Sequence, residues 1–462
     1  MNDRNKNIRS MFALFCVLLA LVVLYLSKYI LIDSKEIINN PYNPRLRLME
    51  ETVRRGQIID SAGVVLADST SGEREYPYGR QLAHLVGSVQ MGKSGVEARY
   101  NILLQSPSME IIQRFKNLPG DGKVTGDTAM LTIDASIQEI VYSAFGQNRG
   151  AAVVMEPSTG RILAMVSRPN FDPARVADNW GELIGDTASS PLLNRATQGL
   201  YPPGSVFKPL TAAAAIENGL ADFIYECSGI ATFGGDTLRC FNSRVHGTVD
   251  MLQAMAVSCN GYFAAAALEI GVEALHEACE RAFFNQDLSY QIERGRSSFT
   301  LSPDASVIDI ARTSIGQGQT LVTPLHMCMV TSAIANNGRM MKPYVLGRQV
   351  SATGAYRSLT LPEVLGQAFS GEVAAALTEM MIEAVGTGSA APAAVAGVSI
   401  AAKTGTAQNA SGDDHGWVTA FAPADGQPQI AIAVVMENAG GPRLGLELVK
   451  KVVEGAVKPV SE

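Results

Sequence analysis

A serine and a lysine three residues apart form the first pair in this sequence that could do chemistry. They are Ser205 and Lys208, within the segment 201–209, which reads YPPGSVFKP. On a helix, positions i and i+3 lie on one face, and a lysine whose pKa is lowered by burial or by nearby cations can take the proton of a serine hydroxyl. The segment therefore predicts an activated serine nucleophile, although a chain of this length contains about one or two S-x-x-K matches by chance.

The residues around this pair predict an unusual local backbone. Pro202, Pro203 and Gly204 precede the serine, and they favour a sharp turn that leads into a helix. Ser205 would then lie at a helix N-terminus, where free N–H groups favour developing negative charge. Pro209 cannot lie deep inside a helix, so we expect the first turn to be tight or irregular.

A second motif, Ser258-Cys259-Asn260, lies between two helical patterns. It offers another hydroxyl and a carboxamide. Alone it is weak, because about one S-x-N match arises by chance in a chain of this length. This motif becomes significant only because it lies in the sequence between the first motif and a third.

The third motif is Lys403-Thr404-Gly405-Thr406, on an expected strand near the C-terminus. The lysine supplies a positive charge, and the two threonines supply hydroxyls for an anionic group. The glycine allows the backbone of a ligand to approach the strand closely. These residues predict a binding site for an extended, negatively charged substrate.

The three motifs, in this order and at these long separations, are those of penicillin-binding proteins and β-lactamases. The whole sequence resembles the class B penicillin-binding proteins, the membrane-anchored D,D-transpeptidases of bacterial cell-wall synthesis, from about residue 50 to 440. With a short spacer and no C-terminal repeats, it looks like the penicillin-binding protein A type. Further matching elements are Arg55-Gly56 with Asp60, Gly95-Val96-Glu97, residues 159–165, Asn194-Arg195-Ala196, His246-Gly247, Gly316-Gln317-Gly318, Thr323-Pro324-Leu325 and Trp417.

Three positions depart from the family pattern. Cys259 stands where the middle residue of the second motif is usually aspartate, and we expect its side chain to face away from the reaction. Ala402 replaces a glycine before the third motif, and Val418 replaces an aromatic residue after Trp417. We expect Ala402 and Val418 to lie at the strand edge beside the substrate.

The resemblance implies a catalytic role for five residues. Ser205 attacks the carbonyl between the last two D-alanines of a peptidoglycan stem peptide, and Lys208 takes its proton. Ser258 relays a proton to the leaving amine, and Asn260 orients Lys208 and the substrate amide. Lys403 belongs to the same catalytic set and holds the terminal carboxylate.

The third motif completes the implied substrate site. Thr404 holds the carboxylate together with the lysine, and Gly405 keeps the strand open to the substrate. The backbone N–H groups of Ser205 and Thr406 form the oxyanion hole, which is usually a large contribution to rate. The resemblance implies stem peptides as donor and acceptor and β-lactams as covalent inhibitors. It also implies a polytopic membrane glycosyltransferase as partner, and no cofactor.

Two other functions compete with that of a transpeptidase. A membrane-anchored β-lactamase or β-lactam sensor uses the same three motifs, but a fast hydrolase needs a base that activates water, and no position clearly supplies one. A non-catalytic scaffold is disfavoured because all three motifs are intact.

The N-terminus predicts a membrane anchor. Residues 1–10 carry Arg4, Lys6 and Arg9, and residues 11–32 are almost entirely apolar, which suits one transmembrane helix. No small-x-small cleavage site follows, and the preceding positive charges predict a cytoplasmic N-terminus. The chain after residue 32 is then expected outside the cytoplasm.

The remaining chain divides into two expected domains. Residues 33–147 read as a small β-rich pedestal, and residues 148–462 as the transpeptidase domain. Hairpin patterns flank a region, 205–390, that reads as mostly helical, and a capping box at Ser136 to Glu139 predicts a helix that ends at Phe145. The fold class is therefore α+β. The resemblance implies a five-stranded antiparallel sheet flanked by helices with a helical insertion. The expected elements of the second domain include strands at 151–155, 161–167, 398–408, 417–421 and 429–437, and a helix at 442–457.

Composition excludes other classes. The net charge of −7 leaves no basic surplus for nucleic acid. The five histidines form no metal-binding pattern, so the sequence predicts no metal site. Cys227 and Cys240 could form a disulfide in an oxidising compartment or remain thiols, whereas Cys259, Cys279 and Cys328 fall in helical patterns and are expected to be buried.

Overall fold

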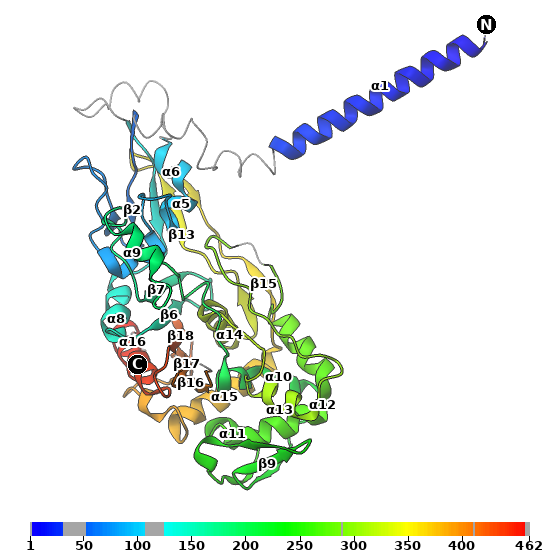
Figure 1. Cartoon of the computed structure of the whole chain (residues 1–462), viewed down its shortest axis with the longest axis vertical. Helices are drawn as coiled ribbons and strands as arrows, with labels where there is room; N and C mark the ends of the chain where they lie inside the picture. The colour runs from blue at the N-terminus through cyan, green and yellow to red at the C-terminus, as the bar shows by residue number, and fades with distance from the viewer. Residues whose placement is uncertain (1, 31–51, 107–123, 288–289, 410–411, 458–462) are drawn as a thin grey trace.

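The structure is a computed structural model that describes all of the chain except residues 1, 31–51, 107–123, 288–289, 410–411 and 458–462. Helix α1 (Asn2–Lys28) stands apart from the other elements in Figure 1. Its segment Asn7–Lys28 is, among the described residues, the one helix long and apolar enough to cross a membrane. The predicted anchor at 11–32 coincides with it through residue 28, and residues 31 and 32 lie outside the described part.

The N-terminal module is organised around a five-stranded sheet in the order β14-β13-β5-β2-β3. Strands β2 and β3 of this sheet form an antiparallel hairpin, and Asp60 N–H donates to Val64 O at its turn. Two strands of the sheet come from residues 346–359, far from the rest of the module in sequence. The strands are β2 (Ile58–Ile59), β3 (Val65–Ala67), β5 (Thr128–Leu131), β13 (Leu346–Val350) and β14 (Tyr356–Leu359).

Short helices and two more strands complete this module. They are β1 (Val53–Arg54), which pairs with β4 (Val124–Thr125), η2 (Gly79–Leu82), α4 (Ala83–Val86), α5 (Gly95–Arg99) and α6 (Asn101–Gln105). The fully buried Glu97 accepts from Arg55 Nε at 2.5 Å and Arg74 Nε at 2.7 Å. Two guanidinium groups thus compensate the burial of one carboxylate.

The second domain contains the predicted five-stranded antiparallel sheet, in the order β16-β17-β18-β6-β7. Its strands are almost continuously apolar because helices cover both faces. Helices α8 and α16 pack on one face and α14 on the other (Figure 1). The elements are α8 (Ala135–Phe145), β6 (Gly150–Met155), β7 (Ile162–Arg168), α14 (Pro324–Ala335), β16 (Ala401–Ala407), β17 (His415–Ala422), β18 (Ile430–Met436) and α16 (Arg443–Ala456).

One predicted helix begins differently than expected. Helix α8 ends at Phe145 as predicted, but its N-cap is Asp134 and not Ser136. The Asp134 carboxylate accepts from the backbone N–H of Ser136 at 2.9 Å and of Ile137 at 3.2 Å. The expected capping box is therefore wrong, because the aspartate two residues earlier satisfies the first free N–H groups.

The region 205–390 is less uniformly helical than predicted. Its helices are α10 (Lys208–Glu217), α11 (Met251–Ala256), α12 (Asn260–Arg281), α13 (Val307–Ser314), α14 and α15 (Gly371–Gly386). Short strands interrupt them, and each pairs with a strand nearby in sequence or with the N-terminal module. Besides β13 and β14 they are β8 (Tyr225–Cys227), β9 (Ile230–Phe233), β10 (Asp236–Arg239), β11 (Gly247–Val249), β12 (Arg339–Met341) and β15 (Val364–Gln367).

Candidate active site

The predicted nucleophile lies on a tight helical turn. Residues Gly204–Phe207 form the 3₁₀ helix η3, and Lys208 begins α10 with Pro209 in its first turn. The backbone N–H of Lys208 donates to Ser205 O. Side chains at i and i+3 of a 3₁₀ turn eclipse one another, so Ser205 and Lys208 leave the backbone on the same side. The expected tight first turn is confirmed.

Close backbone packing fixes this turn. Gly204 has φ +57° and donates its N–H to Gly316 O at 2.8 Å. A Cβ on Gly316 would lie 2.1 Å from Gly204 O, and one on Gly204 would lie 2.6 Å from Thr406 O. Trp417 Nε1 donates to Pro202 O at 3.0 Å. These contacts explain Gly204 and Gly316, because an added Cβ at either position would displace the turn that carries Ser205. The hydrogen bond from Trp417 fixes the chain just before this turn.

Lys208 connects the first motif to the second. Its side chain is fully buried, and Nζ donates to Ser258 O at 2.8 Å, Ser258 Oγ at 3.1 Å and Asn260 Oδ1 at 2.7 Å. Burial lowers the pKa of Lys208 to about 8, against the opposing attraction of Cys259 and Cys240. Roughly a tenth of the amine is therefore neutral at pH 7, and the neutral form is the one that a general base requires.

Lys403 reaches the same hydroxyl from the sheet. Its Nζ donates to Ser258 Oγ at 2.9 Å and to Thr404 O at 2.9 Å, and the side chain is fully buried. Burial, followed by repulsion from Lys208, holds the pKa of Lys403 well below its usual value. The Ser258 hydroxyl thus lies between two amines, and all three predicted motifs meet at this oxygen.

Ser258 occupies a strained position between α11 and α12. Its φ is +58°, which is uncommon for a residue with a side chain. Cys259 caps α12, and its N–H donates to Ala254 O at 2.8 Å. Asn260 Nδ2 donates to Arg239 O at 2.7 Å, so strand β10 also supports the motif. Such strain persists where the surrounding structure over-determines it, as at active sites.

Strand β16 carries the third motif beside the nucleophile. Gly405 pairs with Trp417 in the register of β16 and β17, and Thr406 O accepts from Gln317 Nε2 at 3.4 Å. The buried Thr404 donates from Oγ1 to Ser389 Oγ at 2.8 Å. Sequence reasoning missed Ser389, because no local pattern in a turn after α15 indicates a partner on β16.

The expectation that Ala402 and Val418 lie at the strand edge beside the substrate is wrong. Ala402 and Val418 are both fully buried in the core between the sheet and its helices α8 and α16. A Cβ on Gly445 of α16 would lie 2.9 Å from Val418 Cγ2. These residues therefore fill the core behind the strand and do not face a substrate.

An ion-pair cluster anchors the chain ahead of the nucleophile. Glu437 accepts from Arg195 Nε at 2.7 Å, from Tyr201 Oη at 2.7 Å and from Arg149 Nε at 3.1 Å. Arg195 was part of the family resemblance, but its carboxylate partner could not be read from sequence, since it lies at the far end of the chain. The cluster ties the segment before Ser205 to the end of β18.

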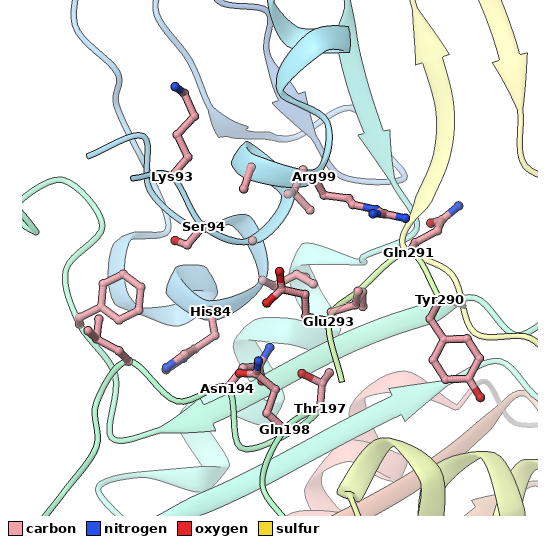
Figure 2. A pocket seen from close by; sticks show the side chains of 17 residues that line it. His84, Lys93, Ser94, Arg99, Asn194, Thr197, Gln198, Tyr290, Gln291 and Glu293 are labelled. Carbon is pink, nitrogen blue, oxygen red and sulfur yellow. The ribbon is translucent and has the colours of Figure 1, made fainter. Parts of the chain in front are cut away.

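A separate cavity of about 430 Å³ lies between the N-terminal module and the second domain (Figure 2). Its lining includes His84, Arg99, Asn194 and Glu293, and none of the eight predicted site residues. His84 Nε2 lies 2.8 Å from Pro191 O, and burial lowers the pKa of His84 to about 4. The cavity thus belongs to the junction of the two parts and not to the three-motif site.

Comparison with known proteins agrees with this arrangement. A family model described as the penicillin binding protein transpeptidase domain matches residues 150–457. The peptidoglycan D,D-transpeptidase PbpA of Mycolicibacterium smegmatis is 35% identical over 437 residues, which cover 88% of each chain. PbpA of Mycobacterium tuberculosis is 32% identical, over 91% of this chain and 92% of that protein.

Solved structures show the same fold. A ceftriaxone acyl-enzyme complex of penicillin-binding protein A from M. tuberculosis superimposes with a TM-score of 0.82 at 30% identity, over 89% of this chain and 100% of that one. The D,D-transpeptidase domain of a peptidoglycan glycosyltransferase from Eggerthella lenta gives a TM-score of 0.79 at 30% identity, over 87% and 98%.

Proposed function

We propose that this chain, which belongs to the penicillin-binding protein transpeptidase family, cross-links peptidoglycan stem peptides through an acyl-enzyme on Ser205. One observation carries the residue assignment. The Ser258 hydroxyl lies 3.1 Å from Lys208 Nζ and 2.9 Å from Lys403 Nζ. This contact joins the base beside the nucleophile to the cation on the substrate strand, as a proton relay across an acyl-transfer site requires.

In the first half-reaction, Ser205 Oγ attacks the carbonyl carbon between the last two D-alanines of a donor stem peptide. Neutral Lys208 takes the hydroxyl proton as the bond forms. The proton passes through Ser258 to the amine of the leaving D-alanine when the peptide bond breaks. Asn260 holds Lys208 through Oδ1 and orients the substrate amide.

The substrate is held along β16. Lys403 and Thr404 bind the terminal carboxylate, and Gly405 allows the peptide to lie close to the strand. The N–H groups of Ser205 and Thr406 stabilise the tetrahedral oxyanion, a contact whose loss costs on the order of 10²–10³ in rate in comparable sites. The tight packing of Gly204 against Thr406 O keeps these two N–H groups in fixed relation.

In the second half-reaction, an amine from another stem peptide attacks the ester carbonyl of the acyl-enzyme. The new C–N bond forms as the bond to Ser205 Oγ breaks, and the proton lost by the amine returns to Ser205 Oγ through Lys208. A β-lactam resembles the D-Ala-D-Ala end, so it acylates the same serine. Acyl-enzyme complexes with ceftriaxone, imipenem and penicillin G are known for penicillin-binding protein A of M. tuberculosis.

The domain organisation supports a site held away from a membrane. Residues 1–10 are the cytoplasmic tail, 11–32 the anchor, 33–147 the pedestal and 148–462 the transpeptidase domain, with the β13–β14 hairpin of the latter completing the pedestal sheet. The catalytic domain is extracytoplasmic in this arrangement, and a polytopic glycosyltransferase contacts the anchor and pedestal.

Fluorescent penicillin tests the nucleophile. Full-length protein in detergent should label covalently, with the adduct on the Ser205 peptide by mass spectrometry. Ser205→Ala should abolish labelling without loss of thermal stability, whereas Ser143→Ala, at an exposed position of α8, should leave it unchanged. Labelling on another residue would refute the assignment. Release of the drug within seconds would favour a β-lactamase.

A further inference from the structure

Three cysteines and a histidine gather directly beside the second motif. Cys227 ends β8, Cys240 precedes the 3₁₀ turn η4 (Phe241–Ser243), His246 precedes β11, and Cys259 caps α12. Their four ligand atoms all lie within 4.8 Å of one another. The three cysteines are buried and the histidine is partly buried. The mechanism proposed above uses none of these side chains.

The spacing of the ligand atoms suits a tetrahedral metal ion. Cys227 Sγ lies 3.7 Å from Cys240 Sγ, and Cys240 Sγ lies 3.9 Å from Cys259 Sγ. Zinc bonded to sulfur at ~2.3 Å in tetrahedral geometry separates two sulfurs by about 3.8 Å. Cys227 Sγ lies 3.4 Å from His246 Nδ1, against about 3.5 Å for a sulfur and an imidazole nitrogen on one zinc ion.

Local hydrogen bonds hold the ligands in place. Cys259 Sγ accepts from the backbone N–H of Tyr262, in the first turn of α12, at 3.5 Å. Backbone pairing fixes the loops that carry the other ligands. His246 N–H donates to Cys227 O at 3.3 Å and Cys240 N–H donates to Gly229 O at 3.0 Å.

A disulfide is the competing explanation. Cys227 and Cys240 are thiols in this structure, and their 3.7 Å separation exceeds a disulfide bond of ~2.05 Å. A bridge between them would leave Cys259 and His246 without a role in the cluster. A single metal ion uses all four groups.

We propose that Cys227, Cys240, His246 and Cys259 form a structural zinc site. Zinc is preferred because three thiolates and one imidazole around a closed tetrahedral position are the ligands and geometry of structural zinc sites. The histidine pattern that predicted no metal site could not reveal this one, since three of the four ligands are cysteines separated by long loops.

The zinc ion positions the second catalytic motif. This step rests on the function proposed above. Cys259 lies between Ser258 and Asn260, so a bond from its sulfur to zinc fixes the backbone on both sides. Arg239, whose carbonyl accepts from Asn260 at 2.7 Å, directly precedes the ligand Cys240. The metal therefore holds Ser258 in its strained conformation and Asn260 toward Lys208.

Metal analysis of the full-length protein in detergent tests the site. We expect about one zinc ion per chain after purification through a tag that does not bind metal. Cys240→Ser and His246→Asn should each lower zinc at least tenfold, whereas Cys279→Ala, a buried cysteine of α12 outside the cluster, should retain it. Replacement of zinc by cobalt in the unaltered protein should produce thiolate-to-cobalt charge transfer and the visible bands of a tetrahedral site, and Cys240→Ser should change these bands.

Two results would overturn the site. One is fewer than about 0.1 zinc per chain together with a Cys227–Cys240 disulfide in non-reducing mass spectrometry. The other is cobalt spectra that are identical in Cys240→Ser and the unaltered protein. The zinc measurement does not depend on the catalytic assignment, because Ser205→Ala should keep its zinc. The zinc site can therefore be confirmed even if Ser205 is not the nucleophile.

Removal of zinc tests the positioning role. Chelation should slow acylation of Ser205 by fluorescent penicillin roughly tenfold or more, as loss of supporting groups commonly does, and added zinc should restore the rate. An unchanged acylation rate in protein shown to have lost its metal would refute the positioning role.

Discussion

The two sides of the site are built in different ways. The sheet side comprises η3, β16 and β17, and it carries Ser205 and Lys403. The strand β16 pairs with β17 over its whole length, from Ala401↔Phe421 to Ala407↔His415, with cores on both faces. The loop side carries Ser258 and Asn260, and its strands β8 and β11 pair over three residues in a sheet of two.

The difference shows two solutions to the same requirement. Catalytic atoms must be held within a fraction of an ångström, and the sheet side achieves this through extended hydrogen bonding and close glycine contacts. The loop side has few such contacts, yet it holds Ser258 at φ +58°. The proposed zinc site gives this side a local constraint that does not depend on a large core.

Lys208 connects the two sides, so its removal should have the largest effect on acylation. Lys208→Ala should slow acylation by fluorescent penicillin about 10³-fold or more, because it removes the proposed general base and groups that act as a unit fail together. Stopped-flow labelling measures the rate. Lys342→Ala, which removes a partly exposed lysine paired with Glu363, is the control and should label normally. Rapid labelling of Lys208→Ala would show that another group takes the proton.

The pH dependence of acylation tests whether burial between the two sides sets the basicity of Lys208. Burial lowers its pKa to about 8, so the neutral, proton-accepting form prevails above that pH. The acylation rate should fall towards a slope of about tenfold per pH unit below pH 8, or about fiftyfold from pH 8 to 6, and level off above pH 8. Thermal unfolding at each pH controls for loss of structure. A rate that rises steadily to pH 10 would indicate an ordinary exposed amine.

The sheet side of the molecule could be predicted from sequence better than the loop side. The strands β6, β7, β17 and β18 were predicted because both faces of the sheet are buried, which produces long apolar runs. The three motifs predicted the residues that meet at Ser258. Their order along the chain, however, did not reveal which atoms touch.

The rest depends on contacts that no local pattern specifies. Strands β13 and β14 join the sheet of the N-terminal module through pairing with β5, far earlier in the chain. Ser389 supports the third motif from a turn, and Arg239 supports the second motif from the end of strand β10. Neither residue has a sequence signature of its own. His246 and the three cysteines come together only when β8, β11 and α12 pack against one another.

Gly316 tests how the sheet side fixes the nucleophile. In Gly316→Ala the new Cβ would lie 2.1 Å from Gly204 O at a φ of +74°, so the turn that carries Ser205 must shift. Strain of this kind costs about 1–3 kcal/mol, and we expect acylation to slow roughly 10- to 100-fold. Gly219→Ala is the matched control, since its φ is +81° but no atom lies within 4 Å. Equal effects of the two substitutions would show that backbone conformation alone matters, and not the contact with the nucleophile turn.

The smallest expected effect concerns Ser389, which contacts Thr404 at the proposed carboxylate-binding end of the sheet side. Its Oγ accepts from Thr404 Oγ1 at 2.8 Å. Ser389→Ala removes this partner, and a hydrogen bond of this kind contributes about 0.5–1.5 kcal/mol, so acylation should slow by about tenfold at most. The loss should appear in drug binding and not in the chemical step, because Thr404 is expected to contact the carboxylate and not the reacting carbonyl. Thr404→Val should have the larger effect, since it also removes the proposed carboxylate contact itself. The dependence of labelling rate on drug concentration separates the two steps, and a defect confined to the chemical step in Ser389→Ala would place Ser389 with the proton relay on the loop side.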